Sequence, residues 1–140
     1  MQKLVKQLKT LSEANAGKPV STKQIILCQR SLNDNGIAQI PAEYVEFLHH
    51  FNAFAYDGGF LYGIAPLKGF FMDIIGENLL ADLPFPETTI VLGSDECCYL
   101  VWNTEQNRYQ LIDKTDRMVL NTYTDCADAI RDILKIEDDD

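Results

Sequence analysis

Apolar residues in the first part of the chain recur at the three- and four-residue spacing of amphipathic helices. A first helix is predicted from Leu4 to Leu11, and the Gly-Lys-Pro sequence at 17–19 ends it. Ser21 is a favourable N-cap for a second helix, which would extend to Gly36. The chain therefore opens with two helices, each with one apolar face.

A third helix is predicted to begin at Pro41, because proline is tolerated at the first helical position, where its missing N–H would have no partner. Its apolar face is aromatic, and the residues on it are Tyr44, Phe47, Leu48 and Phe51. The turn residues Asp57-Gly58-Gly59 follow, and an aromatic strand comes after them. We expect the aromatic face of this helix to lie in a core.

The second half of the chain changes from helical to extended spacing. A pair of short strands is predicted over residues 60–64 and 69–72, and residues 73–81 are compatible with a short helix. Four further strands are predicted over residues 88–92, 97–102, 109–113 and 118–123, before a final helix with Thr124 or Asp125 as N-cap. The strand at 97–102 is apolar on both faces, so we expect it to be central and covered on both sides.

This order of elements predicts an α+β fold, in which N-terminal helices pack on a largely antiparallel multi-stranded sheet that a C-terminal helix closes. The length of 140 residues is typical of one domain. We expect a single domain over residues 1–136 and an acidic tail at 137–140.

Two stretches of the sequence match a known family pattern. The first runs from Ile40-Pro41 through Tyr44, Phe47-Leu48, Asn52 and Asp57-Gly58 to Leu61-Tyr62-Gly63-Ile64. The second comprises residues 91–96 (VLGSDE), the strand from Cys98 to Trp102 and residues 109–113. Both resemble signatures of the SUKH superfamily, whose members include fungal cell-wall-synthesis regulators and many bacterial immunity proteins.

The chain departs from that family pattern at one place. Where the family has Asn-Gly, this sequence has Asn52-Ala53, and its glycines come later, at Gly58 and Gly59. We therefore expect the loop to be longer or differently turned here.

The charge of the chain limits its partners. The net charge is −9, and four of the acids form the tail at 137–140, so that 12 bases against 17 acids leave −5 on the rest. Binding to nucleic acid requires clustered Lys and Arg, so nucleic acid is not an expected ligand. An acidic surface favours a basic protein partner, because complementary potentials speed their encounter.

No segment of the sequence indicates a membrane or an oxidising compartment. No run approaches the ~18 apolar residues of a membrane helix, and the N-terminus lacks the apolar region of a signal peptide. We expect a cytoplasmic protein that is a monomer or a weak homodimer. All four cysteines, Cys28, Cys97, Cys98 and Cys126, are expected to be free and buried.

Few residues suit catalysis. His49 and His50 are the only histidines, so a nucleophile such as Cys97 or Cys98 would have to use one of them. No phosphate-binding, dinucleotide, zinc or acyl-transfer motif occurs. We predict no catalytic residue, no metal ligand and no cofactor.

Two carboxylate pairs leave an alternative open. Asp73 and Glu77 are four residues apart, and Asp95 and Glu96 are adjacent. Such pairs can serve glycoside hydrolysis or bind a divalent cation, but they are common in a chain with 21 acids.

The predicted partner-binding residues lie in the turns at strand ends and beside them, where recognition residues concentrate. They are Tyr56, Asp57, Phe70, Asp95 and Glu96, and we expect Tyr56 and Phe70 to be exposed. Ordinary turn chemistry is the competing explanation, since Gly, Asp and Ser also serve turns through their backbone conformations and local hydrogen bonds.

The resemblance implies a non-enzymatic domain that binds proteins, and most directly an immunity protein. Such a protein would neutralise a cognate toxin domain, of nuclease or deaminase type, by direct binding. A cytosolic scaffold or regulatory adaptor is the alternative, and an unrecognised hydrolase is a third possibility.

Overall fold

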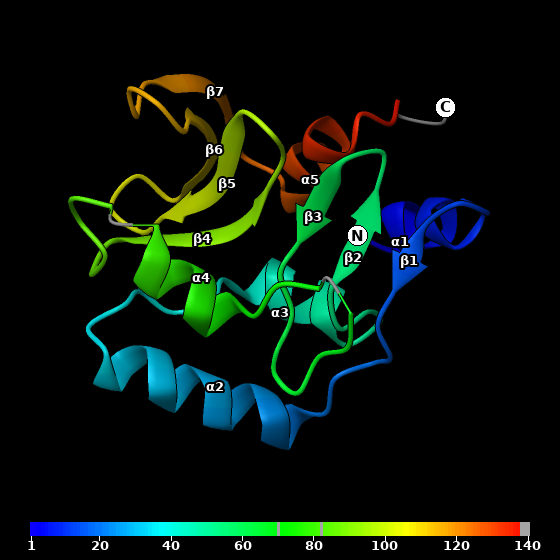
Figure 1. Cartoon of the computed structure of the whole chain (residues 1–140), viewed down its shortest axis with the longest axis horizontal. Coiled ribbons are helices and arrows are strands. Elements are labelled where there is room, and N and C mark those ends of the chain that lie inside the picture. The colour runs from blue at the N-terminus through cyan, green and yellow to red at the C-terminus, as the bar shows by residue number, and fades with distance from the viewer. Residues whose placement is uncertain (70, 82, 138–140) are drawn as a thin grey trace.

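The computed structural model describes residues 1–69, 71–81 and 83–137, which form one antiparallel sheet and five helices (Figure 1). The helices are α1 Gln2–Lys9, α2 Thr22–Asp34, α3 Ala42–Leu48, α4 Ile74–Leu80 and α5 Cys126–Leu134. The seven strands are β1 Asn15–Ala16, β2 Phe54–Tyr56, β3 Gly59–Leu61, β4 Thr89–Ser94, β5 Cys98–Asn103, β6 Arg108–Asp113 and β7 Val119–Tyr123. They lie in the sheet in chain order, and the predicted α+β fold class is confirmed.

Several helix starts follow directly from capping residues. Ser21 precedes α2 and forms a capping box with Gln24, in which each side chain bonds the backbone N–H of the other. Asp73 caps α4 by accepting the N–H of Gly76, whereas Asp125 occupies the N-cap position of α5 without a described side-chain bond to the helix. Pro41 is the N-cap of α3, one residue before the predicted position.

The aromatic face of α3 lies in the core, as predicted. Tyr44, Phe47 and Leu48 are fully buried, and Phe51 is buried just beyond the end of the helix. The Phe51 ring lies 5.6 Å from that of Phe47 and 5.2 Å from that of Phe54, between ring centroids. These contacts join α3 to β2 through aromatic packing.

The pairing between β3 and β4 is short. These strands pair at Phe60↔Ser94 and Leu61↔Gly93, the N–H of Tyr62 donates to the carbonyl of Leu92 at 2.8 Å, and β4 has a bulge between Val91 and Gly93. Beyond these pairs, a side chain hydrogen-bonds the backbone of β4 in place of β3. The amide of Asn78, on α4, accepts the N–H of Val91 at 2.7 Å and donates to its carbonyl at 2.8 Å.

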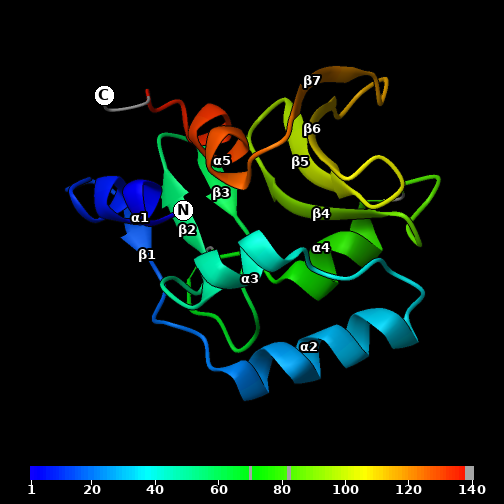
Figure 2. The ribbon, with the colours of Figure 1, turned by 180° about the vertical axis from the view of Figure 1, so that it is seen from behind.

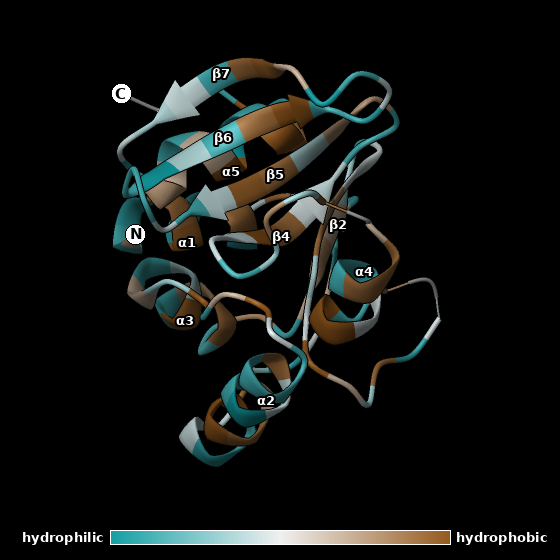
Figure 3. Ribbon diagram, turned by 90° about the vertical axis from the view of Figure 1, so that its left-hand side faces the viewer, coloured by the Kyte–Doolittle hydropathy of each residue, from teal (hydrophilic) through white to brown (hydrophobic). Residues whose placement is uncertain are grey.

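The C-terminal helix α5 packs against β3, β5 and β6, and its buried residues include Ile130 and Ile133. From behind, α5 and α3 lie in front of the sheet, and α2 lies along the lower margin near α4 (Figure 2). Apolar segments of β4, β5 and β6 lie side by side (Figure 3). Among the described helices, none is long and apolar enough to cross a membrane.

The sequence-based assignment was wrong in the first half of the sheet. Strands β1 and β2 were not predicted, and the predicted strand over residues 69–72 is absent: Gly69, Phe71 and Met72 lie in a loop. Because Gly63 donates to the carbonyl of Met72 and Ile74 donates to that of Gly63, this loop returns beside Gly63 without forming a strand.

The cysteines depart from expectation at one position. All four are free, and Cys28, Cys98 and Cys126 are buried, but Cys97 is exposed in the turn before β5. Of the predicted acidic tail, only Glu137 is among the described residues.

Candidate functional site

Three hairpin turns gather at one end of the sheet. They are residues 56–59 between β2 and β3, residues 94–98 between β4 and β5, and residues 113–118 between β6 and β7. The strand pairs Phe60↔Ser94 and Cys98↔Asp113 place neighbouring turns beside each other. We call these three turns the loop end.

The first turn has the geometry that an Asp-Gly hairpin requires. Tyr56 pairs with Gly59, and the two residues between them have positive φ values, 50° at Asp57 and 80° at Gly58, as in a type I′ turn. Asp57 is exposed at its tip. Tyr56 is half-buried and packs partly against the core, so its predicted exposure is only partial.

The second turn uses one of the predicted binding residues as a structural group. Asp95 Oδ1 accepts the N–H groups of Cys97 at 2.8 Å and Cys98 at 2.7 Å, and Oδ2 lies 3.6 Å from Nζ of Lys135. This is the turn chemistry that competed with partner binding. Its neighbour Glu96 is exposed and makes no such contact among the described residues.

The third turn is also built by aspartates. Asp113 accepts the N–H of Thr115 at 2.7 Å, and Asp116 accepts that of Met118 at 2.9 Å. The N–H of Lys114 donates to the carbonyl of Cys97 at 2.9 Å, which joins this turn to the second one. Asp116 is exposed.

The basic side chains within these turns contact other groups of the protein. Lys114 Nζ lies 5.2 Å from the centroid of the Tyr99 ring, and the Arg117 guanidinium lies 5.4 Å from it. Arg117 also donates to the carbonyls of Lys114 and Ala81, both at 2.9 Å. The loop end therefore presents exposed carboxylates while its own cations are engaged within the protein.

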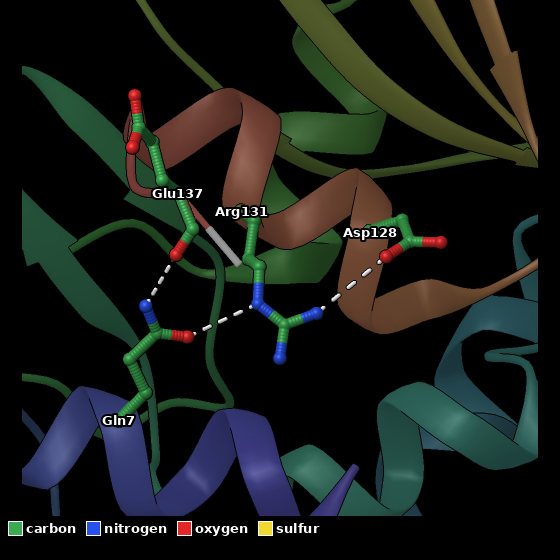
Figure 4. A network of polar contacts seen from close by, with 4 residues as sticks. All are labelled: Gln7, Asp128, Arg131 and Glu137. Carbon is green, nitrogen blue, oxygen red and sulfur yellow. Dashed lines mark hydrogen bonds and ion pairs between the residues drawn. The ribbon is translucent and has the colours of Figure 1, made fainter. Parts of the chain in front are cut away.

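The end of α5 that carries Lys135 is fixed to α1 by a polar network (Figure 4). Arg131 is buried, and its Nε donates to Oε1 of Gln7 at 3.0 Å, while one Nη lies 3.5 Å from Asp128. The Gln7 amide donates in turn to the backbone carbonyl of Glu137. This network holds the C-terminal end of α5 in place next to the loop end.

The other residues weighed for chemistry are mostly engaged in structure. Asp73 caps α4 with one oxygen, and its other oxygen is buried without a described partner. His49 Nδ1 lies 2.9 Å from the carbonyl of Val20. Burial, and then the charge of Asp95, raises the pKa of Cys98. Among the described residues, no group of three His, Cys, Asp or Glu side chains is placed to hold a metal ion.

The structure thus gathers Asp57, Asp95 and Glu96 at the loop end, whereas Phe70 lies outside the described residues. Asp116 and Lys135 belong to the same surface and were not predicted. The sequence could have indicated Asp116 as a binding residue, because it lies in the turn between two predicted strands. It could not have indicated Lys135, because the position of Lys135 depends on how α5 packs.

Comparisons with known proteins add no family assignment: no family model matches the chain, and no curated protein matches it. The resemblance to the SUKH superfamily rests on the residue pattern alone.

Proposed function

We propose that this chain is a non-enzymatic protein-binding domain, and that its loop end contacts a basic surface of the partner. One observation carries the proposal. Asp57, Glu96 and Asp116 are exposed on three adjacent turns, while Lys114, Arg117 and Lys135 are engaged by Tyr99 or Asp95. Such a surface attracts Lys and Arg of a partner and repels acidic competitors.

The SUKH-like pattern supports a specific role for this domain. It would be an immunity protein that neutralises a cognate toxin domain by covering its active groove. A nuclease or deaminase toxin has a basic groove for nucleic acid, and exposed carboxylates complement such a groove. Charge-assisted contacts between carboxylates and Arg or Lys would hold the complex.

The experiment is an affinity purification from the native host, followed by measurement of association with the purified partner. Glu96→Lys is the test variant, because Glu96 is exposed and holds no turn together. Glu87→Lys is the control: it makes the same charge change at an exposed position before β4, at the opposite end of the sheet.

We expect the Glu96→Lys change to slow association at least about tenfold at low salt, and the Glu87→Lys change to have little effect. Added salt should slow the wild-type association, because exposed charges are screened beyond a Debye length of about 8 Å at physiological ionic strength. Equal rates for both variants would refute the loop end as the contact surface. A captured partner whose toxicity is not relieved by co-expression of this chain would refute the immunity role.

A further inference from the structure

A hollow lies at the end of the sheet opposite the loop end, between the segment after β1 and the loop that precedes α4. Its volume is about 320 Å³. This falls at the lower limit of small-molecule pockets, which span about 300–1,000 Å³. The described residues whose chemistry matters here are Lys18, Asn52, Pro66, Leu67, Lys68 and Phe71. We call this hollow the Lys18–Lys68 pocket.

One wall of the pocket is fixed by backbone contacts. Gly17 donates to the carbonyl of Ala53 at 3.1 Å, and Asn52 donates to that of Lys18 at 2.8 Å. A Cβ atom at Gly17 would lie 1.6 Å from the carbonyl oxygen of Asn52, so only glycine permits this approach. The backbone that carries Lys18 is therefore held in position.

The opposite wall is a loop closed at its base. The Asn52 amide donates to the carbonyl of Ile64 at 2.9 Å and accepts its N–H at 2.6 Å. The two ends of the loop are also joined, because the N–H of Gly63 donates to the carbonyl of Met72 at 2.9 Å. Compact loops with closed bases are frequently functional. Because Asn52 contacts both walls, the pocket is formed before any ligand arrives.

The chemistry of the lining indicates an anion with an apolar body. Pro66, Leu67 and Phe71 supply apolar surface, and the lysines supply two positive charges. Neither ammonium has an ion pair or hydrogen bond among the described residues, and no acid is among those that line the pocket. Two lysines therefore line one pocket in a protein whose net charge is −9.

We propose that the Lys18–Lys68 pocket binds a small organic anion, in which a carboxylate or phosphate group meets the two lysines and an apolar body lies against Leu67 and Phe71. The Asn52 amide is occupied by Ile64, so the two ammonium groups are the charges that would hold the ligand. This inference does not depend on the proposed function, since the loop end lies at the opposite end of the strands.

The test titrates the full chain with phenylacetate and, separately, with phenyl phosphate. Binding is monitored through the amide chemical shifts in NMR spectra. We expect saturable shifts at Gly17, Lys18 and Lys68 with at least one probe, and the tighter probe identifies the head group. Phenethylamine, which has the same ring and a positive charge, should cause no saturable shift. Acetate and inorganic phosphate should bind at least about tenfold more weakly, because they lack the apolar body.

The variant Lys18→Gln/Lys68→Gln should weaken binding at least about tenfold, whereas Lys23→Gln, an exposed lysine on α2 outside the pocket, should leave it unchanged. Thermal unfolding of each variant shows whether it remains folded, and both exposed lysines are removable without disturbing the core. The proposal is overturned if neither anion saturates, if phenethylamine binds equally well, or if the double variant binds as the wild type does.

Discussion

The side chain of Asn52 binds both backbone polar groups of Ile64, at 2.9 Å to the carbonyl and 2.6 Å to the N–H. Asn78 does the same for Val91. In each case an amide takes the place of a neighbouring strand where pairing in the sheet has ended. Buried or half-buried backbone groups need such partners, because an unpaired polar group costs free energy.

Replacement of Asn52 should therefore destabilise the protein. We expect Asn52→Ala to lower the free energy of unfolding by about 2–3 kcal/mol, because two hydrogen bonds are lost and the Ile64 groups are left unpaired. Asn33→Ala, on the exposed side of α2, should stay within about 0.5 kcal/mol of wild type. Urea denaturation measures both, and equal stabilities for the two variants would contradict the role of the Asn52 amide.

Ala53 provides a second prediction, since its φ is +73°, the left-handed region that glycine adopts readily. The SUKH pattern that the sequence resembles has glycine at this position, so the departure in sequence still coincides with a glycine-like backbone. We expect Ala53→Gly to stay within about 1 kcal/mol of wild type. The loss of a buried methyl, about 0.8 kcal/mol, is offset by relief of about 1–2 kcal/mol of left-handed strain.

Ala129→Gly is the matched control for Ala53→Gly. Ala129 is also fully buried, but it lies in α5, where glycine lowers helix stability by about 1 kcal/mol in addition to the lost methyl. We expect a loss of about 2 kcal/mol. If both glycine variants lose the same stability in urea denaturation, the left-handed strain at Ala53 is not significant.

The predictable part of the fold is the part that local chemistry determines. The N-cap residue Ser21 marks the start of α2, and turns rich in Gly, Asp, Asn and Lys mark the limits of the strands from β4 to β7. The Asp57-Gly58 turn was visible as well, although its preceding strand β2 was missed. In these cases the residues that determine the structure are neighbours in the chain.

The unpredicted part depends on contacts between distant residues. Strand β1 has two residues and exists because it pairs with Ala55 and Phe54. Residues 69–72 are apolar enough for a strand in the sequence, but the described ones, Gly69, Phe71 and Met72, lie in a loop that returns beside Gly63 through its contacts with Met72 and Ile74. At the loop end, Lys135 reaches Asp95 across 40 positions of sequence, a contact that no local pattern indicates.

The two neighbouring acids of the second turn should behave differently when truncated. Asp95→Ala should lower the free energy of unfolding by about 1–3 kcal/mol, because the N–H groups of Cys97 and Cys98 lose their acceptor. Glu96→Ala should change it by less than about 0.5 kcal/mol. Chemical denaturation distinguishes these outcomes. An Asp95→Ala variant as stable as the wild type would mean that Asp95 is not needed for the turn and is available to contact a partner.

The exposure of Cys97 predicts selective thiol labelling. In the native protein at neutral pH, a bulky thiol reagent should modify Cys97 and leave Cys28, Cys98 and Cys126 largely unmodified, because these three are buried and burial raises their pKa values. Mass spectrometry should find one label per chain, which Cys97→Ser removes. Labelling of Cys28 at a similar rate would show that α2 opens readily.

The buried thiols also predict how stability depends on pH. Burial, and then the charge of Asp73, raises the pKa of Cys28 from 9.0 to about 11, so the folded protein keeps this proton after the unfolded chain has released it. The stabilisation is fully present below pH 9 and is lost as the pH rises toward 11, because the folded state then binds more protons than the unfolded state. Cys126, whose pKa burial also raises, acts in the same direction.

Urea denaturation between pH 8 and pH 10 under reducing conditions should therefore show a free energy of unfolding that falls as the pH rises past the ordinary cysteine pKa of 9.0. The decline should be shallower in Cys28→Ala, which has lost one titrating group. Comparing slopes within each variant removes the separate effect of the lost packing at position 28. Equal slopes in wild type and Cys28→Ala would mean that Cys28 ionises as easily in the folded chain as in the unfolded one.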